Sequence, residues 1–135
     1  MAKESGLAWT TLSVDDSAGT PRDIRNDITN LSFSTPRGVQ DVTGIDKSAI
    51  ERLLLLADFS MTLNGVFDDG ANLAHVTLKT ASSFTGLRTV SINISGQTLA
   101  CESVLTDYQM TRAQSGELTW SAPLSLGDGT VPTWS

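Results

Sequence analysis

Apolar and polar residues alternate along most of this 135-residue chain, and this alternation is its strongest structural constraint. Between Asp58 and Phe67, the apolar residues Phe59, Met61 and Leu63 alternate with polar ones, and residues 118–124 repeat the pattern. A period of two residues is that of a β-strand with one buried face. Similar short segments, rich in Ser, Thr and β-branched residues, occupy positions 7–14, 28–34, 88–95 and 97–105. Together they predict a mainly β domain, either a sandwich or a barrel.

Two segments depart from this alternation. Residues 68–81 begin with aspartates that can cap a helix, and one helical stripe follows, made of Ala71, Ala74, His75 and Leu78. This segment is the best candidate for a helix. Residues 46–58 also begin with a capping residue, Asp46, but their four consecutive leucines fit neither period. We interpret them as a helical turn within a long excursion between strands.

The segment before the last predicted strand is polar on both sides. Within residues 106–113, Tyr108, Met110 and Arg112 share one face, and Gln109 and Thr111 lie on the other. Two explanations fit this pattern. The segment is either an edge strand that faces water, or a strand whose second face belongs to an assembly larger than one chain.

Composition and charge exclude several classes of protein. The 9 basic and 15 acidic side chains leave a net charge of −6, whereas a nucleic-acid-binding surface needs a basic stripe. The longest apolar run, residues 53–57, is far shorter than the ~20 residues that span a bilayer, so we expect no membrane insertion. The first residues have no apolar segment of the signal-peptide type, and Cys101 is a lone cysteine. We therefore expect synthesis in a reducing cytoplasm, which the resemblance given below implies is that of a bacterial host.

The residues that enzymes and metal sites require are nearly absent. His75 is the single histidine and Cys101 the single cysteine, so neither a clustered metal site nor a typical nucleophile–base pair is indicated. Two aspartate pairs, at residues 15–16 and 68–69, lie in predicted turns, where Asp is favoured for local backbone bonding. We predict no catalytic, cofactor-binding or metal-binding residues, and no enzyme activity.

The three tryptophans have different expected environments. Trp9 and Trp120 occupy inward positions of predicted strands and are core candidates. Trp134 is the next-to-last residue, where a chain is usually loose and wet. A large aromatic there suggests a side chain held in place by a neighbouring subunit. The alternative is a side chain simply exposed at the end of the chain.

The order and spacing of these features resemble one known family. The most specific portions are Asp41-Val42-Thr43-Gly44, the strand at 56–68 with Gly65 and Phe67, and the hairpin at 106–124. Over essentially its whole length the chain resembles the major tail tube proteins of long-tailed (siphovirus-type) bacteriophages, especially those of phages that infect actinobacteria. None of these portions is a catalytic signature.

The resemblance implies a fold, an assembly and partners. The fold is a β-sandwich or barrel with one flanking α-helix, the tail tube fold shared with the tubes of type VI secretion and contractile injection systems. Residues 1–135 then form a single tail tube domain with an extended arm around residues 43–57. Six copies form a ring, and stacked rings form the tail tube of the virion, through which DNA passes to the host. The implied partners are other copies of the chain, a tape-measure protein inside the tube, and tail terminator and distal tail proteins.

Within this assembly, two groups of residues receive expected roles. Four consecutive leucines would make a poor surface loop, so we assign part of the arm to subunit contacts, together with Trp134: Ile50, Leu53, Leu54, Leu55 and Leu56. The alternative is a turn packed on the chain's own sheet. A channel that lets DNA slide should be acidic or neutral, which makes Glu102, Asp107 and Glu117 candidates for facing the lumen. Their alternative position is the outer, solvated face.

Three other functions compete with this one. An inner tube of a contractile tail, tailocin or injection system would have the same fold. A carbohydrate- or receptor-binding sandwich from a phage fibre should carry aromatic residues near its loop tips, whereas the aromatics here fall mostly within strands. An enzyme ranks last because the chain lacks suitable residues.

Overall fold

The structure is a computed structural model that describes residues 3–135. In that part the chain forms strands, one short α-helix and two 3₁₀ turns. The elements are η1 (Gly6–Ala8), β1 (Trp9–Asp15), β2 (Pro21–Asp23), η2 (Arg25–Asp27), β3 (Ile28–Ser34), β4 (Arg37–Asp41), β5 (Arg52–Ala57), β6 (Ser60–Val66), α1 (Ala74–Leu78), β7 (Arg88–Ile94), β8 (Gln97–Leu105), β9 (Gln109–Arg112) and β10 (Leu118–Leu126). The prediction of a mainly β fold with one helix on its flank is confirmed.

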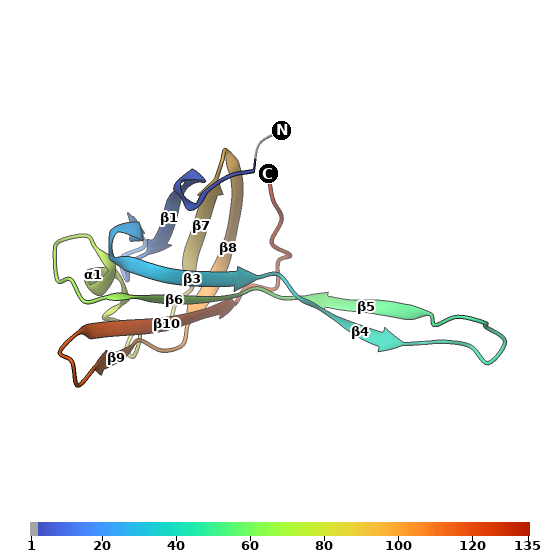
Figure 1. The fold of residues 1–135 in the computed structure, drawn as a ribbon. Coiled ribbons are helices and arrows are strands. Elements are labelled where there is room, and N and C mark those ends of the chain that lie inside the picture. Colours follow the sequence, from blue (N-terminus) through green and yellow to red (C-terminus); the bar gives the residue numbers. More distant parts are fainter. Residues whose placement is uncertain (1–2) are drawn as a thin grey trace.

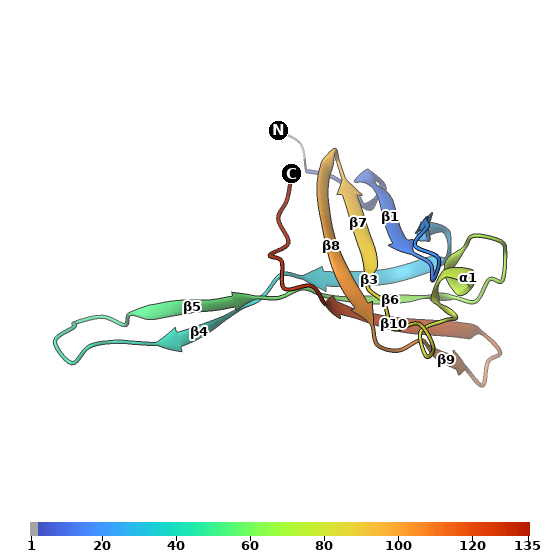
Figure 2. The same cartoon turned by 180° about the vertical axis from the view of Figure 1, so that it is seen from behind.

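Eight strands form one antiparallel sheet in the order β2-β1-β7-β8-β10-β6-β3, and β9 pairs with the first part of β10. The sheet bends where β10 changes partner. Its residues 118–121 pair with β9, and its residues 124–126 pair with β8. Pro123, which has no N–H to donate, lies at this change of partner. As a result β1, β7 and β8 cross over β3, β6 and β10, with the core between them (Figures 1 and 2).

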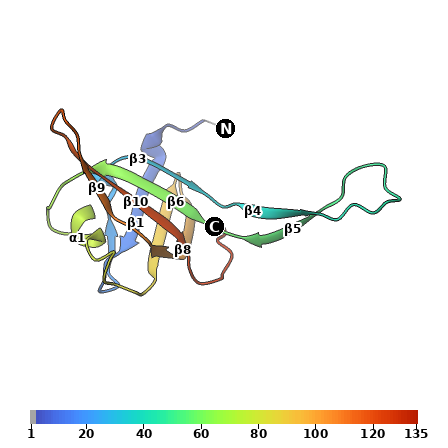
Figure 3. The same cartoon turned by 90° about the horizontal axis from the view of Figure 1, so that it is seen from below.

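The remaining two strands, β4 and β5, form a separate hairpin. It continues from the ends of β3 and β6 and projects away from the body (Figures 1 and 3). The helical turn predicted for residues 46–58 is wrong, because residues 52–57 are strand β5, in which Leu54 pairs with Val39 and Leu53 with Gln40. The leucine run indicated no period of its own, so pairing with β4 decides its conformation.

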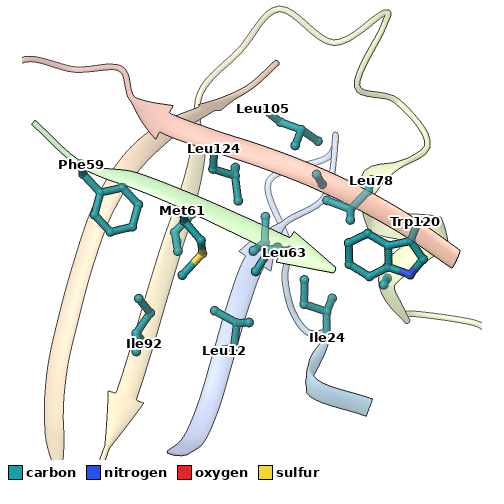
Figure 4. Close-up of a cluster of buried hydrophobic side chains, with 14 of the residues drawn as sticks. Leu12, Ile24, Phe59, Met61, Leu63, Leu78, Ile92, Leu105, Trp120 and Leu124 are labelled. Carbon is teal, nitrogen blue, oxygen red and sulfur yellow. The ribbon is translucent and has the colours of Figure 1, made fainter. Parts of the chain in front are cut away.

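The core is built from the alternating positions that the sequence marks. Phe59, Met61 and Leu63 are fully buried against Leu12, Val14, Val90 and Ile92 of the crossing strands (Figure 4). The core prediction is confirmed for Trp120. Trp9 is only partly buried and packs edge-to-face on Phe33, with ring centroids 5.7 Å apart.

Helix α1 lies inside the predicted segment but is shorter, and its N-terminus is stabilised differently. No side chain caps it locally, and Asp68 accepts a hydrogen bond from Gly70 N–H in the preceding turn. The buried carboxylate of Asp27 instead accepts the N–H of Ala74 at 3.0 Å. An acidic group stabilises the positive end of a helix, so a residue 47 positions away in sequence performs the capping role.

Arg88 is buried and joins three elements. Its guanidinium donates to the carbonyls of Asp15 and Thr77, at 2.8 Å each, and to the hydroxyl of Thr80. It also lies over the Phe84 ring, 5.1 Å from the centroid. Burial lowers the pKa of Arg88 from its ordinary value, and nearby Asp16 and Asp15 oppose that shift. These contacts attach α1 and its following turn to the end of β1.

Replacing Trp120 by alanine is expected to destabilise the subunit by about 3–5 kcal/mol, because the indole is 97% buried and would leave a cavity. The indole N–H donates to the Val66 carbonyl at 2.9 Å, and the ring lies so close to Gly65 that a Cβ there would come within 2.8 Å of it. Urea unfolding measures the loss. The matched control is Ser121→Ala, on the opposite face of β10. An unchanged midpoint for Trp120→Ala would contradict its place in the core.

Candidate assembly surfaces

The β4–β5 hairpin, called the arm below, exposes apolar side chains on both of its faces. Successive residues of a regular strand point to opposite sides, so Leu53 and Leu54, which pair with Gln40 and Val39, lie on opposite faces. The pairing is irregular between Leu54 and Ala57, where Leu54, Leu55 and Leu56 line one open groove. All four are 43–91% exposed, and Ile50 in the connecting loop is 60% exposed. An isolated two-stranded hairpin is marginal in water, and apolar patches of this kind normally mark a contact surface.

The loop end of the arm is held by the segment Asp41-Val42-Thr43-Gly44, which the sequence analysis named as one of its most specific portions. The Asp41 carboxylate accepts hydrogen bonds from the N–H and the hydroxyl of Thr43, and these bonds lower the pKa of Asp41. The Thr43 hydroxyl in turn accepts the N–H of Glu51, across the loop, at 2.8 Å. At the base, the Arg37 side chain donates to the Leu55 carbonyl. Polar contacts within the arm therefore shape it while its leucines stay uncovered.

A second surface is the outer face of β3, β6, β10 and β9, opposite the core. Burial alternates along β6 and β10, and the strand register aligns the outward positions in rows across the sheet. Nearly all of them are hydroxyl or amide residues. The set, called the hydroxyl face below, is Asn30, Ser32, Ser34, Ser60, Thr62, Asn64, Val66, Gln109, Thr111, Thr119, Ser121, Pro123 and Ser125.

The hydroxyl face contains no charged residue, although 18% of the chain is charged. Its hydroxyl groups bond within the sheet, for example Ser34 with Ser60 at 3.2 Å. The acidic and basic side chains lie on other surfaces and at strand ends. A broad surface of this kind hydrogen-bonds water through nearly all of its side chains and has no fixed charge that would attract or repel a polyanion.

The strand that is polar on both sides, at residues 109–112, is an edge strand. Strand β9 pairs with β10 on one side, no strand of the described chain pairs with its other side, and all four of its residues are exposed. The side chains of Met110 and Arg112 lie on the same face of the sheet as the core residue Trp120. Met110 is opposite Trp120 in the register, but it lies outside the buried core and is 40% exposed.

The three carboxylates predicted for the lumen do not lie on one surface. Glu102 is on β8, opposite Thr89 in the register, and its carboxylate accepts a hydrogen bond from the Thr89 hydroxyl. Asp107 is exposed between β8 and β9. Glu117 is exposed at the β9–β10 turn, where a hydrogen bond from Ser115 lowers its pKa. Their position relative to a channel stays a prediction. The hydroxyl face was missed, although its Ser and Thr residues alternate visibly with apolar ones in the sequence.

Trp134 is held by its own chain. It forms an isolated β-bridge with Leu99, and Ser135 exchanges two backbone hydrogen bonds with Thr98. The indole lies 6.1 Å from the Phe33 ring and remains 48% exposed. The exposed half is available to a neighbouring subunit, and that contact stays a prediction.

The two side chains most often used in catalysis or metal binding, His75 and Cys101, are packed against and hydrogen-bonded to neighbouring residues. His75 Nδ1 lies 3.0 Å from the Tyr108 hydroxyl, and its ring packs against Phe67. Cys101 is half-buried beside Ser103, and burial raises the pKa of its thiol, which disfavours the reactive thiolate. Within residues 3–135 no group of three or more His, Cys, Asp or Glu residues is placed to hold a metal ion. In the same residues no helix has the length and apolar character needed to cross a membrane.

Comparison with known proteins shows where this fold has been seen. No protein-family model and no curated protein matches the sequence. Among solved structures, a chain from the virion of a native gene transfer agent particle matches with a TM-score of 0.74 and 15% identity, over 98% of this chain and 99% of that one. A chain from the tail of an empty gene transfer agent particle, determined with helical refinement and C6 symmetry, matches with a TM-score of 0.72 and 15% identity, over 98% of each. The fold is shared from end to end. The predicted tail tube fold is thus confirmed.

Proposed function

We propose that this protein is the tube-forming subunit of a siphovirus-type phage tail, in which stacked rings build a conduit for DNA. The observation that carries the proposal is the hydroxyl face, a broad uncharged polar surface on the sheet from which the arm extends. The fold it shares with a chain of a helical, sixfold-symmetric tail supports the same reading and suggests six copies per ring.

The hydroxyl face suits the wall of a channel that DNA must pass through without being held. Duplex DNA carries a negative charge about every 1.7 Å, so a basic wall would bind it and release counterions. Strands with one face in the core and the other toward an aqueous lumen are typical of wide barrels. Hydroxyl and amide groups keep such a wall wet, and because none is ionised, they give DNA no fixed charge to bind.

The arm suits contacts that stack subunits. It projects from one end of the body, which places its leucines within reach of the body of another copy. Head-to-tail contacts close into a ring when the rotation between copies allows it and otherwise build open, linear assemblies, and contacts between stacked rings are of the open kind. We assign Ile50 and Leu53–Leu56 to these contacts, and because both faces of the arm are apolar, both are covered by neighbouring subunits. The exposed half of Trp134 is assigned to a subunit contact as well.

The remaining partners follow from the proposed role. A tube of defined length needs a tape-measure protein in its lumen, and its two ends meet tail terminator and distal tail proteins. The protein then resides in the virion after synthesis in the host cytoplasm, and its role is structural.

Electron microscopy of the purified protein over a range of concentrations tests this function. We expect long hollow tubes of uniform diameter, with sixfold symmetry in end-on views. A protein that stays monomeric at every concentration would contradict the proposal, as would solid or irregular fibres, because neither contains a channel.

A further inference from the structure

The arm is joined to the body by two short connections. Residues 35–36 lead from β3 into β4, and residues 58–59 lead from β5 back into β6. A backbone hydrogen bond links the two connections, from the Asp58 N–H to the Pro36 carbonyl at 2.9 Å. A two-stranded ribbon is only weakly fixed by its own hydrogen bonds. The direction of the arm therefore depends on what packs at this junction, which is called the arm root below.

Four aromatic side chains gather at the arm root. Phe33 lies one residue before the end of β3, and Phe59 one residue before the start of β6, with ring centroids 6.1 Å apart. The Trp9 indole packs edge-on against Phe33 from β1. The Trp134 indole lies against the same ring, with the two planes inclined by 47°. Phe33 thus has aromatic neighbours from three other parts of the chain, and bending at the end of β3 must move it relative to them.

Trp134 is brought to the arm root by residues 127–135, called the strap below. The strap follows β10 and runs from the arm root along β8 (Figures 1 and 2). Its last residues pair with the edge of β8 beyond the part that β10 occupies. There Trp134 bridges Leu99, and Ser135 exchanges two backbone hydrogen bonds with Thr98, at 2.8 and 3.0 Å. The strap therefore fastens Trp134 to β8 while the indole contacts β3.

The strap also borders the arm itself. Val131 lines the open groove that Leu54, Leu55 and Leu56 form along the arm. The strap thus flanks the arm at two points, the groove through Val131 and the root through Trp134. The arm cannot turn toward this side without displacing the strap.

We propose that the strap holds the arm in one direction before assembly, and that Trp134 is the positioning residue, acting through Phe33. The inference rests on the proposed function, because the direction of the arm matters only if the arm docks on another copy. A segment that is already ordered loses less conformational freedom when it binds. Every subunit of a ring then presents its arm at the same angle.

The distance between arm and body in the unassembled subunit tests the strap directly. In a Cys101→Ser background, Ser48→Cys in the arm loop and Ser17→Cys in the β1–β2 turn, both exposed positions, carry a donor and an acceptor dye. Donor lifetimes recorded at concentrations too low for assembly give the distribution of distances. The parent protein should show one narrow distribution, and Trp134→Ala a broad one. Trp134→Phe keeps an aromatic ring on Phe33 and should restore the narrow distribution.

Three further variants separate positioning from stability. Ser135→Pro removes the N–H that donates to Thr98 and keeps the tryptophan, so it should also broaden the distribution. Its matched control, Ser135→Ala, keeps the backbone donor and should leave the distribution narrow. Phe67→Ala removes a partly buried ring just beyond the far end of β6, so it should lower the melting temperature and leave the arm distance unchanged.

Assembly gives the second readout. If about one subunit in ten presents its arm correctly, the concentration needed for tubes rises about tenfold, because apparent affinity falls with the competent fraction. We expect this rise for Trp134→Ala and for Ser135→Pro. If Trp134 served only as a contact between subunits, its loss would raise this concentration too, but the distance distribution would stay narrow.

A narrow distribution for either Trp134→Ala or Ser135→Pro would overturn the role of the strap and leave the conduit function intact. Equal broadening in Phe67→Ala would overturn it as well, because the arm would then respond to any loss of stability. A wild-type protein that forms no tubes would contradict the conduit function, and the distances in the single subunit would still decide whether the strap holds the arm.

Discussion

Replacing Leu54 and Leu55 by serine is expected to abolish tube formation and to leave the subunit folded. The two side chains line one open groove of the arm and are 56% and 43% exposed in the single chain, so folding alone leaves about half of each uncovered. Full burial of an exposed leucine contributes about 1.5–3 kcal/mol, so covering the remaining half of each side chain on assembly contributes about half of that. The loss recurs at every subunit of the tube. Sedimentation and electron microscopy measure assembly, and circular dichroism with thermal melting measures the fold.

The control for this variant is Leu87→Ser, which removes a leucine of similar exposure, 40%, from the body. It should assemble normally. If the Leu54/Leu55 double variant were instead to unfold, these leucines would belong to the folding core of the subunit, and the arm would not be an assembly device. Normal tubes from the double variant would show that the arm contacts lie elsewhere.

Placing lysine on the hydroxyl face is expected to make tubes hold DNA. The triple variant Ser32→Lys, Asn64→Lys and Thr119→Lys puts one charge on each of three strands, with no two directly opposite in the register. In a ring of six this adds about eighteen positive charges toward the channel, and log affinity for DNA falls by about 0.9 per phosphate contact for each unit of log salt. Tubes should retain short duplex DNA at low ionic strength and release it steeply as salt rises. Phage carrying the variant should adsorb normally and eject slowly.

The comparison variant carries lysine at Glu102, Asp107 and Glu117. It raises the net charge more than the hydroxyl-face variant does, because each change also removes a negative charge. If position decides DNA retention, the hydroxyl-face tubes bind DNA and the comparison tubes do not. The opposite result would place the three carboxylates in the channel, as the sequence alone predicted, and would remove the hydroxyl face from its wall. No retention by either would show that lumen charge does not govern DNA passage.

The sequence by itself determined the features that depend on neighbouring residues. Alternation over five or more positions located β6 and β10 and assigned Met61, Leu63 and Trp120 to the core, because a strand sends successive side chains to opposite faces. The helical stripe located α1 for the same kind of local reason. The sequence also showed a hairpin at residues 106–124 with an unusually polar first strand. In the structure this strand is the edge strand β9.

Only the tertiary structure decided features that depend on residues far apart in the chain. Leu53–Leu56 fit no period, and they form a strand because β4 supplies the hydrogen-bonding partner. The cap of α1 comes from Asp27, and Arg88 can be buried because the distant carbonyls of Asp15 and Thr77 accept hydrogen bonds from its guanidinium. The hydroxyl face exists because register aligns outward residues from four strands that are separate in sequence. Alternation says which residues share a face of one strand, and only pairing between strands decides which faces join into one surface.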